Sequence, residues 1–106
     1  MIDTTAVDAS LSFERRLELL KAVADPTRLE ILDRLAGTSD CCPCDLQPVL
    51  GVPQNLLSHH LKVLREAGLI AGTPRGRRIA YHLRPAGMRE LAAALPALDT
   101  DALTCA

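Results

Sequence analysis

The sequence predicts a single, mainly α-helical domain that carries one small β-hairpin. Of the 106 residues, 48% are apolar and 24% are charged, a balance that can fill a core and argues against a disordered chain. Only 2% are aromatic, so the core must be aliphatic, mostly Leu and Ala, which favours helices over a β-sandwich. A chain this short has room for one domain, and a dimer would bury more of its surface.

Helical periodicity predicts the first two helices. Apolar residues recur at helical spacing over residues 11–24, with charged residues on the other side. Asp25 and Pro26 then restart the helix as N-cap and first helical residue, and Gly37 ends it. Residues 1–10 show no periodicity, and we expect them to form a loose tail.

Two further helices follow, joined by a tight turn at residues 51–53. The ring of Pro48 is tolerated in the first turn of a helix, so we expect this helix to start near Asp45. Beyond the turn, apolar residues at helical spacing predict a helix that ends at Gly68. Two helices around a short glycine-containing turn are typical of a helix-turn-helix.

A hairpin and a last helix complete the domain. Residues 69–71 and 79–83 predict two short strands, with a turn rich in Gly and Arg over residues 73–78. Pro85 opens a last helix, which Pro96 ends or kinks. The order ααααββα is that of a winged helix-turn-helix over residues 11–98, followed by a loose tail at 99–106. We expect the first and last helices to form a dimer interface, because their apolar stripes exceed what one core needs.

Charge is segregated along the chain although its net value is −1. Residues 46–89 hold one acidic residue, Glu66, against seven basic ones, whereas the first 45 residues hold nine acidic residues against five basic ones. Such a distribution predicts one positive face, which suits a nucleic-acid partner. Chance clustering of solvated arginines is the alternative interpretation.

The cysteines are grouped in a way that favours metal or redox chemistry. No apolar run is long enough to span a bilayer, and residues 1–10 do not resemble a signal peptide, so we expect a cytoplasmic protein without a membrane partner. Thiols in that reducing compartment are more often metal ligands or redox groups than disulfides. The candidates are Cys41, Cys42, Cys44 and Cys105.

Four stretches together resemble the ArsR/SmtB family of metal-sensing repressors. Ala24–Leu32 resembles its helix-entry segment, and Cys42–Leu46 is similar to the Cys-x-Cys-Asp-Leu box of its arsenic and cadmium sensors. Ser58–Ile70 resembles its recognition helix, and Gly76–Leu83 its wing. The resemblance implies a homodimeric repressor that binds double-stranded operator DNA and is released by an inducing ion, and it implies no enzyme activity.

The resemblance also implies that Cys42 and Cys44 bind the inducer. Thiolates bind soft ions, and As(III) or Sb(III) needs three sulfurs on one side. The family's arsenic sensors have a third Cys three residues after the second, where this chain has Gln47. The third sulfur must therefore come from Cys41 or Cys105. The zinc site that the family builds on its last helix is not expected here, because residues 86–95 hold no His and only Glu90.

A recognition helix reads base edges with polar side chains near its N-terminus, and wing arginines meet phosphates or the minor groove. In contrast, His60 lies on the apolar face, and we expect it to be a packed structural residue. The candidate DNA-binding residues are Gln54, Asn55, Ser58, His59, Lys62, Arg75, Arg77 and Arg78.

Other functions stay open at this point. The same scaffold could sense Cd(II), Pb(II) or Zn(II), or respond to thiol oxidation or persulfide. A small zinc-buffering or carrier protein that binds no DNA is an alternative from a different class. The segment Cys41–Cys44 also matches Cys-x-Pro-Cys of the thioredoxins, but the βαβ setting of that chemistry is missing, and no other catalytic set is evident.

Overall fold

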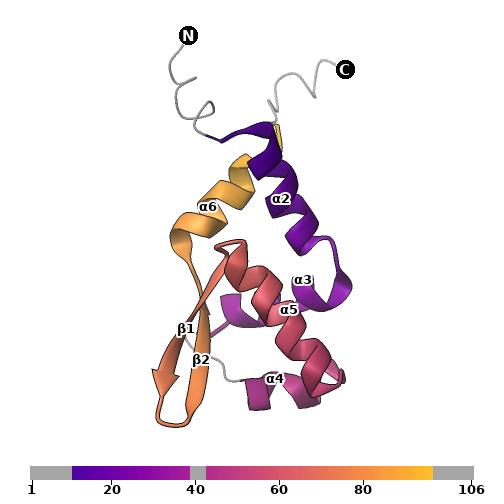
Figure 1. Cartoon of the computed structure of the whole chain (residues 1–106), viewed down its shortest axis with the longest axis vertical. Helices are drawn as coiled ribbons and strands as arrows, with labels where there is room; N and C mark the ends of the chain where they lie inside the picture. The colour runs from indigo at the N-terminus through magenta and orange to yellow at the C-terminus, as the bar shows by residue number, and fades with distance from the viewer. Residues whose placement is uncertain (1–10, 39–42, 97–106) are drawn as a thin grey trace.

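The computed structural model describes residues 11–38 and 43–96. The predicted order of elements is confirmed there. The two expected tails lie outside the described residues. In Figure 1, α2 and α6 lie together at one end of the molecule, and the hairpin tip and α4 lie at the other. The elements are α2 (Phe13–Val23), α3 (Pro26–Ala36), α4 (Pro43–Leu50), α5 (Gln54–Glu66), β1 (Ile70–Arg75), β2 (Arg78–Leu83) and α6 (Pro85–Ala93).

Capping residues fix the starts of the first two described helices. The Ser12 hydroxyl accepts a hydrogen bond from the backbone N–H of Arg15 at 3.0 Å, so α2 begins two residues later than expected. Asp25 Oδ2 accepts from the backbone N–H of Arg28 at 3.0 Å, and Pro26 is the first residue of α3. The predicted roles of Asp25 and Pro26 are therefore confirmed.

The start of α4 differs from the sequence prediction. This helix begins at Pro43 rather than near Asp45, because the fixed φ of a proline suits the first helical position. Pro48 consequently lies beyond the first turn, where it has no N–H to donate to the carbonyl of Cys44. Cys44 thus belongs to the first turn of α4. The helix ends at Leu50, and Gly51 directly after it adopts a left-handed φ of 68°.

The hairpin is longer than predicted. β1 and β2 pair antiparallel from Ile70↔Leu83 to Arg75↔Arg78, so residues 73–75 belong to a strand and not to the turn. Gly76, at φ 65°, permits a turn of only two residues. Pro74 has no backbone N–H to donate. It is tolerated because each strand of a two-stranded sheet has one edge without a partner strand, where no N–H donor is required.

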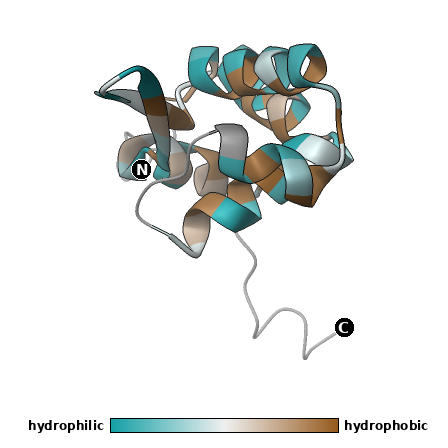
Figure 2. Ribbon diagram, turned by 90° about the horizontal axis from the view of Figure 1, so that it is seen from below, coloured by the Kyte–Doolittle hydropathy of each residue, from teal (hydrophilic) through white to brown (hydrophobic). Residues whose placement is uncertain are grey.

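The core is mainly aliphatic, as predicted, and every described helix from α2 to α5 contributes to it. Figure 2 shows hydrophobic and hydrophilic residues on different faces of the same helices. None of the helices in the described ranges has the length and apolar character needed to cross a membrane. The largest fully buried side chains are Leu19, Ile31, Leu35, Leu46, Leu57, Leu64, Leu69 and Ile70.

The last helix packs tightly against the turn that follows α5. Gly68 in this turn has a φ of 82°, and a Cβ added at Gly87 of α6 would overlap the Gly68 carbonyl oxygen. The backbone N–H of Arg84 also donates to the Leu69 carbonyl oxygen at 2.9 Å. The end of α5 and the start of α6 are therefore held in direct backbone contact.

Candidate nucleic-acid interface and cysteine segment

The outer face of α5 is polar, and its inner face is anchored in the core. Leu57, Leu61 and Leu64 are buried on the inner face, and α4 packs against the same helix. α5 begins directly after the turn from α4, at the end of the molecule that holds α4 (Figure 1). The predicted DNA-binding residues of α5 are all exposed: Gln54, Asn55, Ser58, His59 and Lys62.

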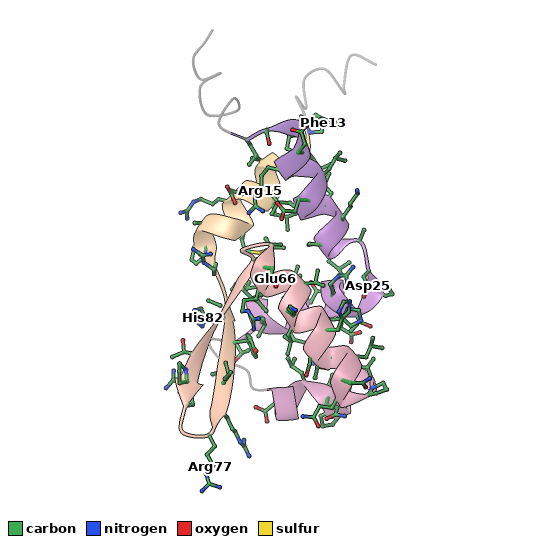
Figure 3. All side chains as sticks on the ribbon, in the orientation of Figure 1. Phe13, Arg15, Asp25, Glu66, Arg77 and His82 are labelled. Atoms are coloured by element: carbon green, nitrogen blue, oxygen red, sulfur yellow. The ribbon has the colours of Figure 1, made fainter. Side chains whose placement is uncertain are left out.

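The hairpin carries its arginines at the tip. Arg75 and Arg78 form the last pair of the strand register, and Arg77 lies between them in the turn. All three are exposed, and Figure 3 shows Arg77 pointing away from the body of the molecule. The tip lies at the same end of the molecule as α4 (Figure 1). A basic wing and the start of a polar helix face therefore share one end of the protein.

His60 is buried on the inner face of α5, as predicted, with 7% of the residue exposed. Arg28 Nη1 lies 3.1 Å from its Nδ1, and Asp25 Oδ2 lies 3.9 Å away. Because a guanidinium can only donate, Nδ1 is the acceptor and neutral His60 carries its proton on Nε2. Burial lowers the pKa of His60, Arg28 adds to the lowering, and Asp25 opposes it.

Arg28 is a residue that the sequence reasoning did not single out. Its Nε donates to the carbonyl oxygen of Ala22 at 2.7 Å, so one side chain links the end of α2 to His60 on α5. The sequence did contain a signal for this role, because Arg28 is a charged residue one turn before Ile31 and Leu32, on the buried face of α3. Its partners could not be inferred from the sequence because they lie on other helices.

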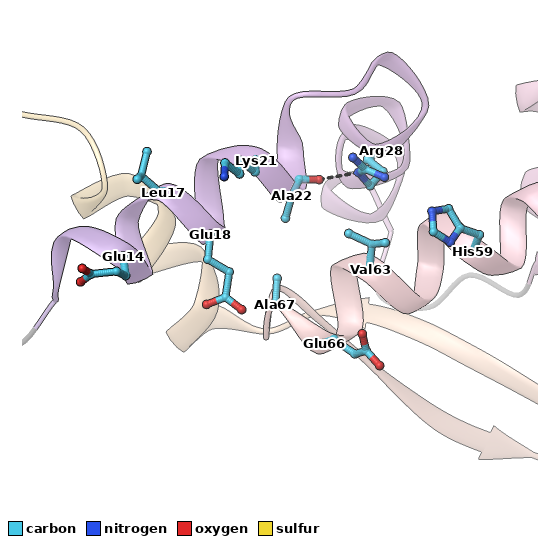
Figure 4. Close-up of a pocket in the computed structure, with 10 residues that line it drawn as sticks. All are labelled: Glu14, Leu17, Glu18, Lys21, Ala22, Arg28, His59, Val63, Glu66 and Ala67. Carbon is cyan, nitrogen blue, oxygen red and sulfur yellow. Dashed lines mark hydrogen bonds between the residues drawn. The ribbon is translucent and has the colours of Figure 1, made fainter.

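A groove separates α2 from α5 beside this contact (Figure 4). Its lining combines the carboxylates of Glu14, Glu18 and Glu66 with apolar groups such as Leu17 and Val63. His59 and Arg28 also line it. Arg28 at this groove bridges the end of α2 to His60 of α5.

The predicted thiol site falls mostly outside the described residues. Cys41, Cys42 and Cys105 lie beyond them, and of Cys44 the backbone alone is described, in the first turn of α4. Within the described ranges, no three His, Cys, Asp or Glu side chains are placed to hold one metal ion. The thiol site stays a prediction based on donor chemistry, since three sulfurs within four residues suit a soft ion.

Comparison with known proteins links these features to one family. Residues 25–71 match the family described as "Bacterial regulatory protein, arsR family". The arsenical resistance operon repressor of Bacillus subtilis is 37% identical over 82 residues, which cover 77% of this chain and 75% of that protein. The HTH-type transcriptional regulator CmtR of Mycobacterium bovis is 38% identical over 85 residues, which cover 76% and 71%.

Solved structures agree with the sequence matches. The crystal structure of a possible transcriptional regulator for arsenical resistance superposes with a TM-score of 0.72 at 30% identity. The superposition covers 83% of this chain and 94% of that one. The match therefore extends over most of the fold as well as over residues 25–71.

Proposed function

The chain belongs to the ArsR family of bacterial transcriptional regulators, and we propose that it is a homodimeric repressor that leaves its operator when As(III) or Sb(III) binds its cysteines. One observation carries the DNA-binding part. The exposed polar face of α5 begins at the end of the molecule that also holds the basic tip of the hairpin. Such an arrangement suits a helix in the major groove beside a wing on the backbone.

Each candidate contact has a chemical reason. Gln54 and Asn55 can bond bidentately to adenine, and Ser58 can serve several bases. His59 and Lys62 continue the exposed face along α5. Arg75, Arg77 and Arg78 supply positive charge for phosphates or a narrow minor groove. Two copies of α5 would lie about 34 Å apart on an inverted repeat.

The inducer is proposed to bind Cys42 and Cys44, with a third sulfur from Cys41 or Cys105. The position of Cys44 in the first turn of α4 supports a link to DNA binding, because α4 packs against α5. Rearranging the entry of α4 should tilt the helix pair. Release requires the ion to bind the DNA-free form more tightly, and a factor of roughly 10 to 150 corresponds to about 1–3 kcal/mol.

The choice of ion needs a direct test, since the relatives bear different names. Fluorescence anisotropy of the reduced protein on a duplex from its own promoter would be followed during separate titrations with arsenite, antimonite, Cd(II) and Zn(II). We expect release by arsenite and not by Zn(II). Cys42→Ser should keep operator binding and lose the arsenite response, and Cys105→Ser tests the tail thiol as third ligand.

Two outcomes would contradict the proposal. Arsenite release of the Cys42→Ser variant would show that the ion binds elsewhere. If the wild-type protein bound no duplex in a salt-dependent manner, the metal-carrier alternative would replace DNA binding.

The neighbouring thiols Cys41 and Cys42 favour a second candidate signal, which is oxidation. Hydrogen peroxide would oxidise two thiols to a disulfide and be reduced to two waters, leaving the protein two hydrogens lighter. That mass change, measured together with DNA release under peroxide and without any metal ion, would identify a redox sensor.

A further inference from the structure

One arginine from another helix holds the C-terminal end of α5. Arg15 lies on α2, and its Nη2 donates to the carbonyl oxygen of Ala67 at 2.8 Å, at the cap of α5. The same atom bonds Glu90 Oε1 of α6 at 2.7 Å, and Nη1 bonds Glu18 Oε1 of α2 at 2.8 Å. A guanidinium at this end also meets the negative pole of the helix dipole. One side chain therefore ties α2, α5 and α6 together.

Backbone packing reinforces this connection independently. The contact between Gly68 and Gly87 leaves no space for a Cβ, so α6 lies directly on the turn that ends α5. We call the group formed by Arg15, Ala67, Gly68, Gly87 and Glu90 the joint. A displacement of α6 or α2 is expected to move the end of α5 through the joint.

The next residue on α2 provides a natural comparison. Arg16 Nε donates to the carbonyl oxygen of Ala94, the cap of α6, at 2.9 Å. Among the hydrogen bonds of the described residues, Arg16 links α2 to α6, whereas Arg15 links both to α5. Two consecutive arginines of equal charge thus differ in whether they reach the recognition helix.

We propose that Arg15 is the positioning residue that sets where α5 lies relative to the α2–α6 pair. In the dimer of the proposed function, on which this assignment rests, α2 and α6 form the interface and α5 enters the groove. The joint would then fix the separation of the two recognition helices, and with it the half-site spacing that the dimer accepts. Arg15 acts through α5 and need not touch DNA.

The test compares Arg15→Gln with Arg16→Gln, which each remove one positive charge from α2. Affinity is measured for the operator duplex and for duplexes whose half-sites are one base pair closer or farther apart. We expect Arg15→Gln to lower operator affinity on the order of tenfold and to weaken the preference for the natural spacing. Arg16→Gln should keep that preference. An unchanged spacing preference in folded Arg15→Gln would overturn the assignment.

Circular dichroism establishes whether each variant is folded before DNA is added. If Arg15→Gln does not fold, Glu90→Gln removes the charge that anchors Arg15 to α6 while leaving its bonds to Glu18 and Ala67. Its spacing preference should weaken in the same direction, and full retention would overturn the assignment. If the wild-type protein binds none of the duplexes, the proposed function fails. If it binds them without a spacing preference, the joint does not set the half-site spacing and the assignment is overturned. Normal wild-type binding with equal behaviour of the two arginine variants overturns the role of Arg15 alone.

Discussion

Single polar side chains connect the helices of this small domain. Arg28 joins the carbonyl of Ala22 to the ring of His60, and Asp25 caps α3 beside them. The sequence predicted two parts of this cluster, Asp25 as a cap and His60 as a packed residue, because both follow from local spacing. The bridging role of Arg28 depends on the packing of α3 against α5, which no local pattern encodes.

The buried histidine predicts a pH dependence of stability. Because the fold lowers the pKa of His60, the unfolded chain takes up this proton first, near the ordinary value of about 6.5. The free energy of unfolding should therefore fall as pH drops below about 6.5, until the folded protein also binds the proton. His60→Gln should flatten this fall in urea titrations between pH 7.5 and 5.

The adjacent exposed residue supplies the control, since His59→Gln makes the same change outside the core. It should keep the wild-type slope, and equal slopes for the two variants would refute the role of His60. Asp25 affects the free energy of unfolding in a separate, lower pH range. Its pKa is lowered, first by the backbone N–H of Arg28, so its contribution is lost only as pH falls below its ordinary 3.8.

Whole elements were predictable where their ends are encoded locally. The cap residues of α3 and the proline that opens α6 are of residue types that prefer the ends of helices. The structure confirms these positions. The start of α4 and the length of the hairpin were predicted wrongly. Pro48 is expected to limit where α4 begins, yet it lies inside the helix. Residues 73–75 are expected in the turn, yet they extend β1, where Pro74 lies at an edge of the two-stranded sheet.

The packing of α6 on the end of α5 predicts that Gly87 cannot be replaced. A Cβ at this position would overlap the Gly68 carbonyl, a rigid backbone atom, so Gly87→Ala must push the two elements apart. Overpacking of this kind costs about 1–3 kcal/mol, which exceeds the gain of roughly 1 kcal/mol that Ala brings to a helix interior. Chemical denaturation should show a net loss of stability.

Gly37→Ala is the matched control, because a Cβ there would meet its nearest atom at 3.7 Å, an ordinary contact. This glycine has a φ of −91°, which alanine also adopts. The variant should be about as stable as the wild-type protein or slightly more stable. A Gly87→Ala protein of undiminished stability would mean that α6 can move away from the turn freely.

At the scale of the whole molecule, the proposed function depends on surfaces at opposite ends. The polar face of α5 and the basic tip were predictable because amphipathic spacing and charge segregation are sequence properties. The sequence predicts the thiol ligands only as a set of candidates. Cys41 is adjacent to Cys42 in the sequence, whereas Cys105 is far from it. Choosing between them as the source of the third sulfur requires knowing how residues far apart in the sequence, or in two subunits, approach each other.

Exposed apolar side chains at the end of the molecule opposite the hairpin predict self-association. Phe13 on α2 is 64% exposed and Leu95 beyond α6 is 59% exposed, in a region that would be covered in the proposed dimer. A two-fold interface buries each such residue twice, and burying one large apolar side chain contributes about 1.5–3 kcal/mol. Phe13→Glu should therefore raise the dimer dissociation constant roughly 100-fold or more.

Sedimentation would detect this as a shift toward the monomer mass of 11.4 kDa, with a parallel loss of operator affinity because half-sites are no longer bound together. Leu29→Glu places the same charge on another exposed apolar residue, which lies on α3, is 52% exposed and is outside the α2–α6 pair. It should remain dimeric. If Leu29→Glu dissociated and Phe13→Glu did not, the interface would involve α3, and the half-site separation would have to be derived from that face.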